Sequence, residues 1–173
     1  DVPRSRISVI PIGTELPPRI EAGNREPLIL AVGEFEPRKR IPALIAGHRQ
    51  YWESASPDPE RCRLVVVGRG GSDEDDVRRA AGEGCELRGF VSDEELDDLY
   101  RRACLLVFPS AFEGFGLPVI EAMARGCPVM LARNSSLREI GGDAAIWLDD
   151  VGPEGIAASL AVALADRDAL AER

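Results

Sequence analysis

The feature that most constrains the fold is the alternation of short apolar runs with segments of helical length. Four runs rich in valine, leucine and isoleucine recur along the chain, at residues 28–32, 64–67, 105–108 and 128–131. Strands that are apolar throughout, rather than at alternate positions, are typical of a parallel sheet covered by helices on both faces. The sequence therefore predicts an α/β fold, an open parallel sheet flanked by helices.

The spacing of apolar residues between and after these runs predicts helices. The predicted helices cover 42–52, 73–81, 92–103, 118–125 and 153–165. The third of them has the clearest signal, because Ser92 and Glu95 form a capping-box pattern at its start and an apolar stripe follows at helical spacing.

Composition narrows the class of protein. The length of 173 residues favours one domain, and an apolar content of 45% suffices for a core. With 30 acidic and 21 basic residues the net charge is −9, so we expect no broad face for nucleic acid or anionic lipid. No apolar run reaches the roughly 18 residues of a membrane span, so no transmembrane segment is expected. We expect a cytoplasmic protein.

Cysteine and histidine usage argues against a metal centre. The four cysteines include no Cys-x-x-Cys pair, which argues against a thiolate metal site; they are Cys62, Cys85, Cys104 and Cys127. Cys104 and Cys127 lie inside or beside apolar runs, which favours buried free thiols over disulfides. The single histidine, His48, excludes a site rich in histidine. It lies on an apolar helical stripe, so we expect a histidine of the core or of a cleft edge, with a catalytic role as the alternative.

Ligands of open parallel sheets bind at the carboxyl ends of the strands, which directs attention to three loops, at 33–40, 68–72 and 109–117. The first begins at Gly33 and lacks both the Walker pattern and a Gly-x-Gly-x-x-Gly turn, so a P-loop ATPase is excluded and an NAD-binding domain is disfavoured. It holds Lys39, the only lysine of the chain. A compact ammonium there indicates a phosphate contact; coding bias that left one lysine by chance is the alternative.

The second loop is glycine-rich and precedes a predicted helix. Gly68 and Arg69 begin it, and two further glycines follow. Backbone amides at such a helix start can approach an anion, although a tight strand-to-helix turn has the same composition, and both interpretations stay open. The acidic residues at 73–75 could be taken for an Asp-x-Asp metal motif, but they are interpreted as the acidic first turn of a helix.

The third loop gives the strongest signal. Pro118 occupies the position expected at a helix start, so the amides of Phe115, Gly116 and Leu117 should point outward as unpaired donors. Glycines on both sides of Phe115, at Gly114 and Gly116, let the backbone approach a ligand closely. These features predict a phosphate-binding helix N-terminus.

Two carboxylates accompany this helix start. Glu113 lies in the loop and Glu121 follows eight positions later inside the helix. At that separation both can line one cleft without touching each other. Carboxylates accept hydrogen bonds from sugar hydroxyls, so the pair indicates a site for a sugar-bearing phosphate compound.

With these motifs the sequence resembles the retaining, nucleotide-sugar-dependent glycosyltransferases of the GT-B fold, family 4, also called glycosyl transferases group 1. The hallmark is a pair of glutamates separated by seven residues around a Gly-Phe-Gly-Leu-Pro core, matched from Glu113 to Glu121. The first loop, the turn at 89–92 and the Gly-Cys-Pro-Val segment at 126–129 are also similar to the family. The resemblance covers nearly the whole chain and implies a Rossmann-like sheet.

The resemblance implies roles for individual residues. Glu121 would hold the ribose hydroxyls, Glu113 would contact the transferred sugar near the reacting centre, and Lys39 would neutralise the diphosphate. The other implied donor-binding residues line the loops, with the base against the turn at 90–91, and they are Gly33, Gly68, Phe90, Val91, Gly114, Phe115, Gly116 and Leu117.

One departure concerns the second phosphate cation. Many members of the family carry an arginine directly after the first-loop glycine, where this chain has Glu34. Arg38 or Arg69 could supply the missing cation, and we favour Arg38. Metal and other cofactors are not expected to be required, since Lys39 and helix amides can replace a cation at the diphosphate.

The resemblance also implies the domain organisation. Residues 1–26 would be the end of an N-terminal domain, whose last strand ends at 7–10, and an interdomain linker. Residues 27–173 would be the C-terminal, donor-binding half of a GT-B enzyme, excised from a longer chain that also holds the acceptor-binding domain. This half should bind nucleotide modestly and transfer nothing alone.

The implied reaction moves a hexose from a GDP- or UDP-sugar to a glycan or lipid-linked acceptor, with a GDP-sugar favoured. It serves cell-surface polysaccharide synthesis, and a lipid-linked acceptor would bring the full-length protein to the inner membrane face. Two alternatives stay open: a nucleotide-sugar 2-epimerase of the same fold, and a non-catalytic domain that senses a nucleotide.

Overall fold

A parallel sheet forms the centre of the protein. The computed structural model describes residues 3–8, 10, 12–15, 25–55, 58 and 60–171. In these residues the sheet has six strands, all parallel, in the order β3-β2-β1-β4-β5-β6. The strands are β1 (Glu26–Val32), β2 (Arg63–Val67), β3 (Cys85–Arg88), β4 (Ala103–Phe108), β5 (Val129–Ala132) and β6 (Ile146–Leu148).

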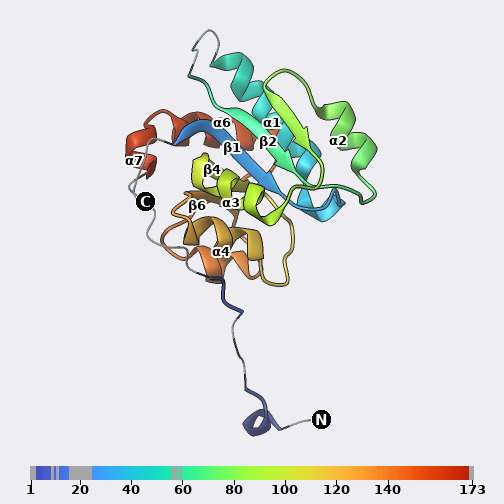
Figure 1. Cartoon of the computed structure of the whole chain (residues 1–173), viewed down its shortest axis with the longest axis vertical. Coiled ribbons are helices and arrows are strands. Elements are labelled where there is room, and N and C mark those ends of the chain that lie inside the picture. Colours follow the sequence, from blue (N-terminus) through green and yellow to red (C-terminus); the bar gives the residue numbers. More distant parts are fainter. Residues whose placement is uncertain are drawn as a thin grey trace.

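Helices cover both faces of the sheet, giving three layers (Figure 1). They are α1 (Ile41–Ser54), α2 (Glu74–Ala80), α3 (Asp93–Arg102), α4 (Leu117–Ala124), α5 (Leu137–Gly141), α6 (Pro153–Leu164) and α7 (Arg167–Ala171), with short 3-10 turns η1 (Arg4–Arg6) and η2 (Pro37–Lys39). One apolar core lies under α1, α2, α6 and α7, and a second under α3, α4 and α5. The expected α/β class is confirmed.

The central strands agree with the sequence prediction and the edge strands do not. The four predicted runs became β1, β2, β4 and β5, with ends shifted by at most two residues. The prediction missed β3 and β6, which are the two edges of the sheet. β3 carries the charged residues Glu86 and Arg88, which interrupt an apolar run, as is common in edge strands. β6 is apolar but has only three residues. In β3, Glu86 is exposed and Cys85 and Leu87 are half-buried.

The capping box predicted at the start of α3 is half correct. Ser92 Oγ accepts a hydrogen bond from the Glu95 amide at 3.2 Å, as expected. In a full capping box the Glu95 side chain would accept from the Ser92 amide. Here the Glu95 carboxylate instead pairs with Arg88 at 2.8 Å. Arg88 ends the unpredicted edge strand β3, so the sequence pattern alone could not reveal this competitor.

The strand end predicted at 7–10 was wrong for the residues that the structure describes. Ile7, Ser8 and Ile10 are not in a strand, and Ile7 and Ile10 are 56% and 85% exposed. A strand needs a hydrogen-bonding neighbour, and no described segment lies beside these residues in the sheet. Val9 and residues 16–24 lie outside the described residues, and the division at 26/27 stays a prediction.

His48 and the cysteines belong to the core. His48 is buried, its Nε2 lies 2.9 Å from the Cys62 carbonyl oxygen, and burial lowers its pKa. This supports the core interpretation, since Cys62 precedes β2 and the strand-end loops lie at the opposite edge. The four cysteines are free thiols, buried except for half-buried Cys85. In the described part of the chain, no helix combines the length and apolarity that crossing a bilayer requires.

The loops after β1 and β2 pack directly on each other. The amide of Gly33 donates to the Val67 carbonyl at 3.0 Å, and Gly68 lies against the Gly33 backbone. A Cβ at Gly68 would come within 1.8 Å of the Gly33 carbonyl oxygen, and φ is +156°. This contact therefore requires glycine at position 68.

We predict that Gly68→Ala lowers the free energy of unfolding by about 2 kcal/mol or more, because the new methyl group must displace the loop after β1. Urea denaturation measures the change. Gly82→Ala is the matched control, since a Cβ there meets nothing within 4 Å. Equal stability of the two variants would contradict the packing described here.

Candidate functional site

The strand order reverses between β1 and β4. Beyond β1 the chain continues to β2 on one side, whereas β4 leads to β5 on the other. At such a reversal the loops leave in opposite directions and open a ligand site between them. The loops concerned are 33–40 and 109–116, which hold the predicted residues Lys39 and Glu113.

A buried ion pair joins these two loops. Lys39 Nζ lies 2.7 Å from Glu113 Oε1, and the two side chains are only 10% and 9% exposed. Arg38 donates to Glu113 Oε2 at 3.2 Å and is itself held by Glu36 at 2.7 Å. A backbone hydrogen bond also joins the two loops, since the Ala111 amide donates to the Arg38 carbonyl at 2.7 Å. We call Arg38, Lys39 and Glu113 the cation–carboxylate cluster.

A fourth loop, after β5, supports Glu113 and was missed by the sequence analysis. Ser135 Oγ accepts from the Glu113 amide at 3.1 Å, and Ser136 Oγ donates to the carbonyls of Glu113 and Phe115 at 3.1 and 2.8 Å. Asn134 donates to the Ser110 carbonyl at 2.8 Å. The available signal was the run of polar residues directly after the apolar run at 128–131.

The start of α4 agrees closely with the prediction. The helix begins at Leu117, with Pro118 in its first turn and Gly116 as N-cap at φ +105°. The amides of Phe115, Gly116 and Leu117 donate to no acceptor in the described part of the chain. Gly114 and Leu117 are exposed, Phe115 is half-buried and Gly116 is buried. These amides can receive an anion.

Glu121 lies in a separate pocket. It belongs to the second turn of α4, and its Oε2 accepts from the Tyr100 hydroxyl at 3.0 Å. A pocket of about 290 Å³ contains it, and the lining residues are Thr14, Glu15, Asp93, Leu96, Asp97, Tyr100, Glu121 and Arg125. Glu113 is not among them, so the structure does not bring the two glutamates into one pocket. We call this cavity the Glu121 pocket.

The second loop forms a tight turn rather than an open anion cradle. The Gly70 amide donates to the Glu74 carboxylate at 3.0 Å, and the Gly70 carbonyl accepts from Phe35 at 3.0 Å. Asp73 is the N-cap residue of α2, and Glu74 lies in its acidic first turn, as the helix interpretation expected.

The remaining predicted residues gather beside this turn. Arg69 lies over the ring of Phe90, 4.9 Å from its centroid, and both side chains are exposed. Val91 is half-buried. Arg69 thus stands apart from the cation–carboxylate cluster, whereas Arg38 belongs to it.

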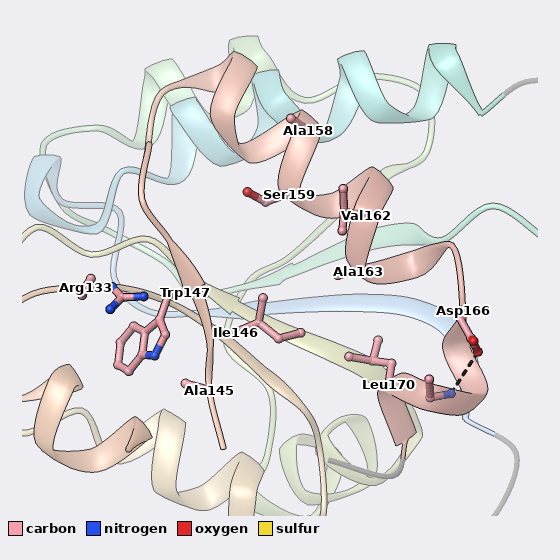
Figure 2. A pocket seen from close by; sticks show the side chains of 11 residues that line it. Arg133, Ala145, Ile146, Trp147, Ala158, Ser159, Val162, Ala163, Asp166 and Leu170 are labelled. Carbon is pink, nitrogen blue, oxygen red and sulfur yellow. Dashed lines mark hydrogen bonds between the residues drawn. The ribbon is translucent and has the colours of Figure 1, made fainter. Parts of the chain in front are cut away.

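A larger pocket lies elsewhere and contains none of the predicted residues. It measures about 670 Å³ and lies between β6, α6 and α7 (Figure 2). Its lining is mainly alanine and aliphatic side chains, with Arg133 over the Trp147 ring at one end. In the described residues, no group of three or more His, Cys, Asp or Glu is arranged to hold a metal ion.

The buried pair Lys39–Glu113 should be strongly coupled. In a double-mutant cycle on unfolding free energy with Lys39→Met and Glu113→Gln, we predict a coupling of about 2 kcal/mol or more, because either single change leaves a buried charge short of a partner. The exposed pair Arg79–Asp76 on α2 is the control, with an expected coupling below about 0.5 kcal/mol. Similar couplings for both pairs would contradict the burial of the cluster.

Comparisons with known proteins show the family of this chain. The family model described as glycosyl transferases group 1 matches residues 14–173. O-antigen chain mannosyltransferase B of Escherichia coli is 37% identical over 144 residues, which is 79% of this chain and 36% of that protein. D-inositol 3-phosphate glycosyltransferase of Nocardia farcinica is 34% identical, covering 96% of this chain and 42% of that protein. The chain thus spans less than half the length of these relatives.

Solved structures share the fold. A TarM variant of S. aureus, in complex with Fondaparinux, alpha-GlcNAc-glycerol and UDP, has a TM-score of 0.70 at 20% identity over 91% of this chain and 31% of that chain. A UDP-forming trehalose-phosphate synthase of Burkholderia xenovorans has a TM-score of 0.67 at 18% identity, covering 86% and 38%. The Rossmann-like sheet therefore has the GT-B type of architecture. Together with the family match, these findings place the chain in the glycosyl transferases group 1 family.

Proposed function

We propose that this chain is the donor-binding half of a retaining family 4 glycosyltransferase, which transfers a hexose from a nucleoside-diphosphate sugar to a glycan or lipid-linked acceptor. The observation that carries the proposal is the cation–carboxylate cluster at the strand reversal, next to the amino end of α4. The family match supports the reaction class. The acceptor would bind an N-terminal domain of the longer protein.

The cluster suits the leaving group of such a reaction. Transfer breaks the bond between the anomeric carbon and the phosphate oxygen, so positive charge develops on the sugar and negative charge on the leaving diphosphate. Lys39, Arg38 and the amides at 115–117 would hold the diphosphate, and Glu113 would face the sugar. With these donors at hand, we propose that no metal ion is required.

The Glu121 pocket suits the other end of the donor. It has four carboxylates, from Glu15, Asp93, Asp97 and Glu121, against one guanidinium, from Arg125. Such a pocket repels phosphate and accepts hydrogen bonds from hydroxyl groups. We therefore propose that Glu121 binds the ribose, while Phe90 and Val91 lie near the base.

The names of the relatives point to the substrate. O-antigen chain mannosyltransferase B and the serotype-specific mannosyltransferase WbdA of Escherichia coli are similar to this chain at 37% and 31% identity. We propose a mannosyl or related hexosyl donor, with GDP favoured over UDP as the nucleotide, in the synthesis of cell-surface polysaccharide. The relatives are transferases by name, which favours transfer over the epimerase and the nucleotide sensor.

Nucleotide titration tests the proposed donor site. Calorimetry with GDP, UDP and ADP should show one nucleotide that binds, and Glu121→Ala should weaken it by more than about tenfold, roughly 1.4 kcal/mol. The cause is the loss of the acceptor for the ribose hydroxyls.

Glu154→Ala is the control for this titration, since Glu154 is exposed in the first turn of α6 and does not line the Glu121 pocket. The Glu154→Ala variant should bind the nucleotide with the same affinity as the wild-type chain. A Glu121→Ala variant that binds as tightly as the control would contradict the assignment of the ribose to Glu121.

A further inference from the structure

The buried side chain of Tyr100 contacts the carboxylate of Glu121. It lies in the last turn of α3, only 1% exposed, in the apolar core under α3 and α4. Its hydroxyl is the polar end of an otherwise apolar contact and donates to Glu121 Oε2 at 3.0 Å. A buried tyrosine hydroxyl needs such a partner, so the contact ties the packing of the core to the pocket.

The direction of this hydrogen bond is fixed. Burial and the charge of Glu121 raise the pKa of the Tyr100 phenol well above its usual range. The phenol therefore stays protonated and acts as the donor, and the carboxylate acts as the acceptor. One oxygen of Glu121 is oriented by this bond, while Oε1 receives no hydrogen bond from a described residue.

The arginines near Glu121 donate to acceptors other than its carboxylate. Arg125 donates to Asp97 Oδ1 at 2.6 Å and to the backbone carbonyl of Glu121 at 3.2 Å. Arg101 donates to Asp97 Oδ2 at 2.5 Å. In the described part of the chain no cation forms an ion pair with the Glu121 carboxylate, so Tyr100 is the side chain that orients it.

We propose that Tyr100 is a positioning residue for ribose recognition, which aligns the Glu121 carboxylate so that it accepts the paired hydroxyls of the ribose. The inference rests on the proposed function, and it adds the group that sets the preference for a ribonucleotide over a deoxyribonucleotide. A carboxylate already held in place binds a diol with less loss of side-chain freedom than a mobile one.

The test separates this role from a purely structural one. Tyr100→Phe removes only the hydroxyl, and Tyr51→Phe makes the same change in the other core, where the Tyr51 hydroxyl accepts from the Cys62 amide at 3.2 Å. Each protein is titrated with GDP and UDP and with their 2′-deoxy counterparts. A loss of packing alone would weaken both kinds of nucleotide alike.

We expect the wild-type chain and Tyr51→Phe to prefer the ribonucleotide. Tyr100→Phe should weaken the ribonucleotide by about tenfold and the 2′-deoxynucleotide by less than about twofold, so that the preference falls. A preference that survives in Tyr100→Phe, or an equal loss for both nucleotides, would overturn the positioning role. A wild-type chain without any preference would instead overturn the ribose site itself, and with it this inference.

A second measurement does not require a destabilising change at Tyr100. The chain has two tyrosines, so in Tyr51→Phe a biosynthetic 3-fluorotyrosine label reports on Tyr100 alone. The fluorine resonance should shift on saturation with the ribonucleotide and shift less with the 2′-deoxynucleotide. Equal shifts, or none at saturation, would overturn the inference.

Discussion

The ion pair between Lys39 and Glu113 is the interaction on which the site depends. It joins residues 74 positions apart, across the reversal between β1 and β4, at an Nζ–Oε1 distance of 2.7 Å. Both groups are nearly buried, and a buried charge is tolerated only when a partner compensates it. This ion pair therefore holds together the loops after β1 and β4. The same ammonium group could bind a phosphate, and the same carboxylate could accept a hydrogen bond from a sugar hydroxyl.

The surrounding loops give this pair its geometry. Close packing of Gly68 on Gly33 brings the second loop under the first, and the serines after β5 hold the backbone of Glu113. At the other side of α4, Tyr100 and Glu121 connect the core to an acidic pocket. In the proposed function, the phosphates of the ligand would meet the cations of the cluster, and its hydroxyl groups would meet the acidic Glu121 pocket.

The central strands of the sheet and the start of α4 could be predicted from the sequence, for physical reasons. Central parallel strands are buried on both faces, so β1, β2, β4 and β5 appear as continuous apolar runs. The edge strand β3 carries two charged residues, and the edge strand β6 has only three residues. The start of α4 was predictable because Gly116 and Pro118 have strong local preferences.

Contacts made through space were not predictable in the same way. The sequence marked Lys39 and Glu113 separately, but not their ion pair with each other, because nothing local encodes a partner 74 positions away. Tyr100 looked like one more apolar position of a helical stripe, and its bond to Glu121 appears only when α3 and α4 are packed. The supporting Ser135 and Ser136 had no periodic pattern at all.

The most direct test of the account is a crystal structure of the chain with its preferred nucleoside diphosphate. We predict the diphosphate between Lys39, Arg38 and the amides at the start of α4, and the ribose hydroxyls on Glu121. A nucleotide bound instead in the pocket between β6, α6 and α7, or with its phosphates directed into the Glu121 pocket, would contradict the account.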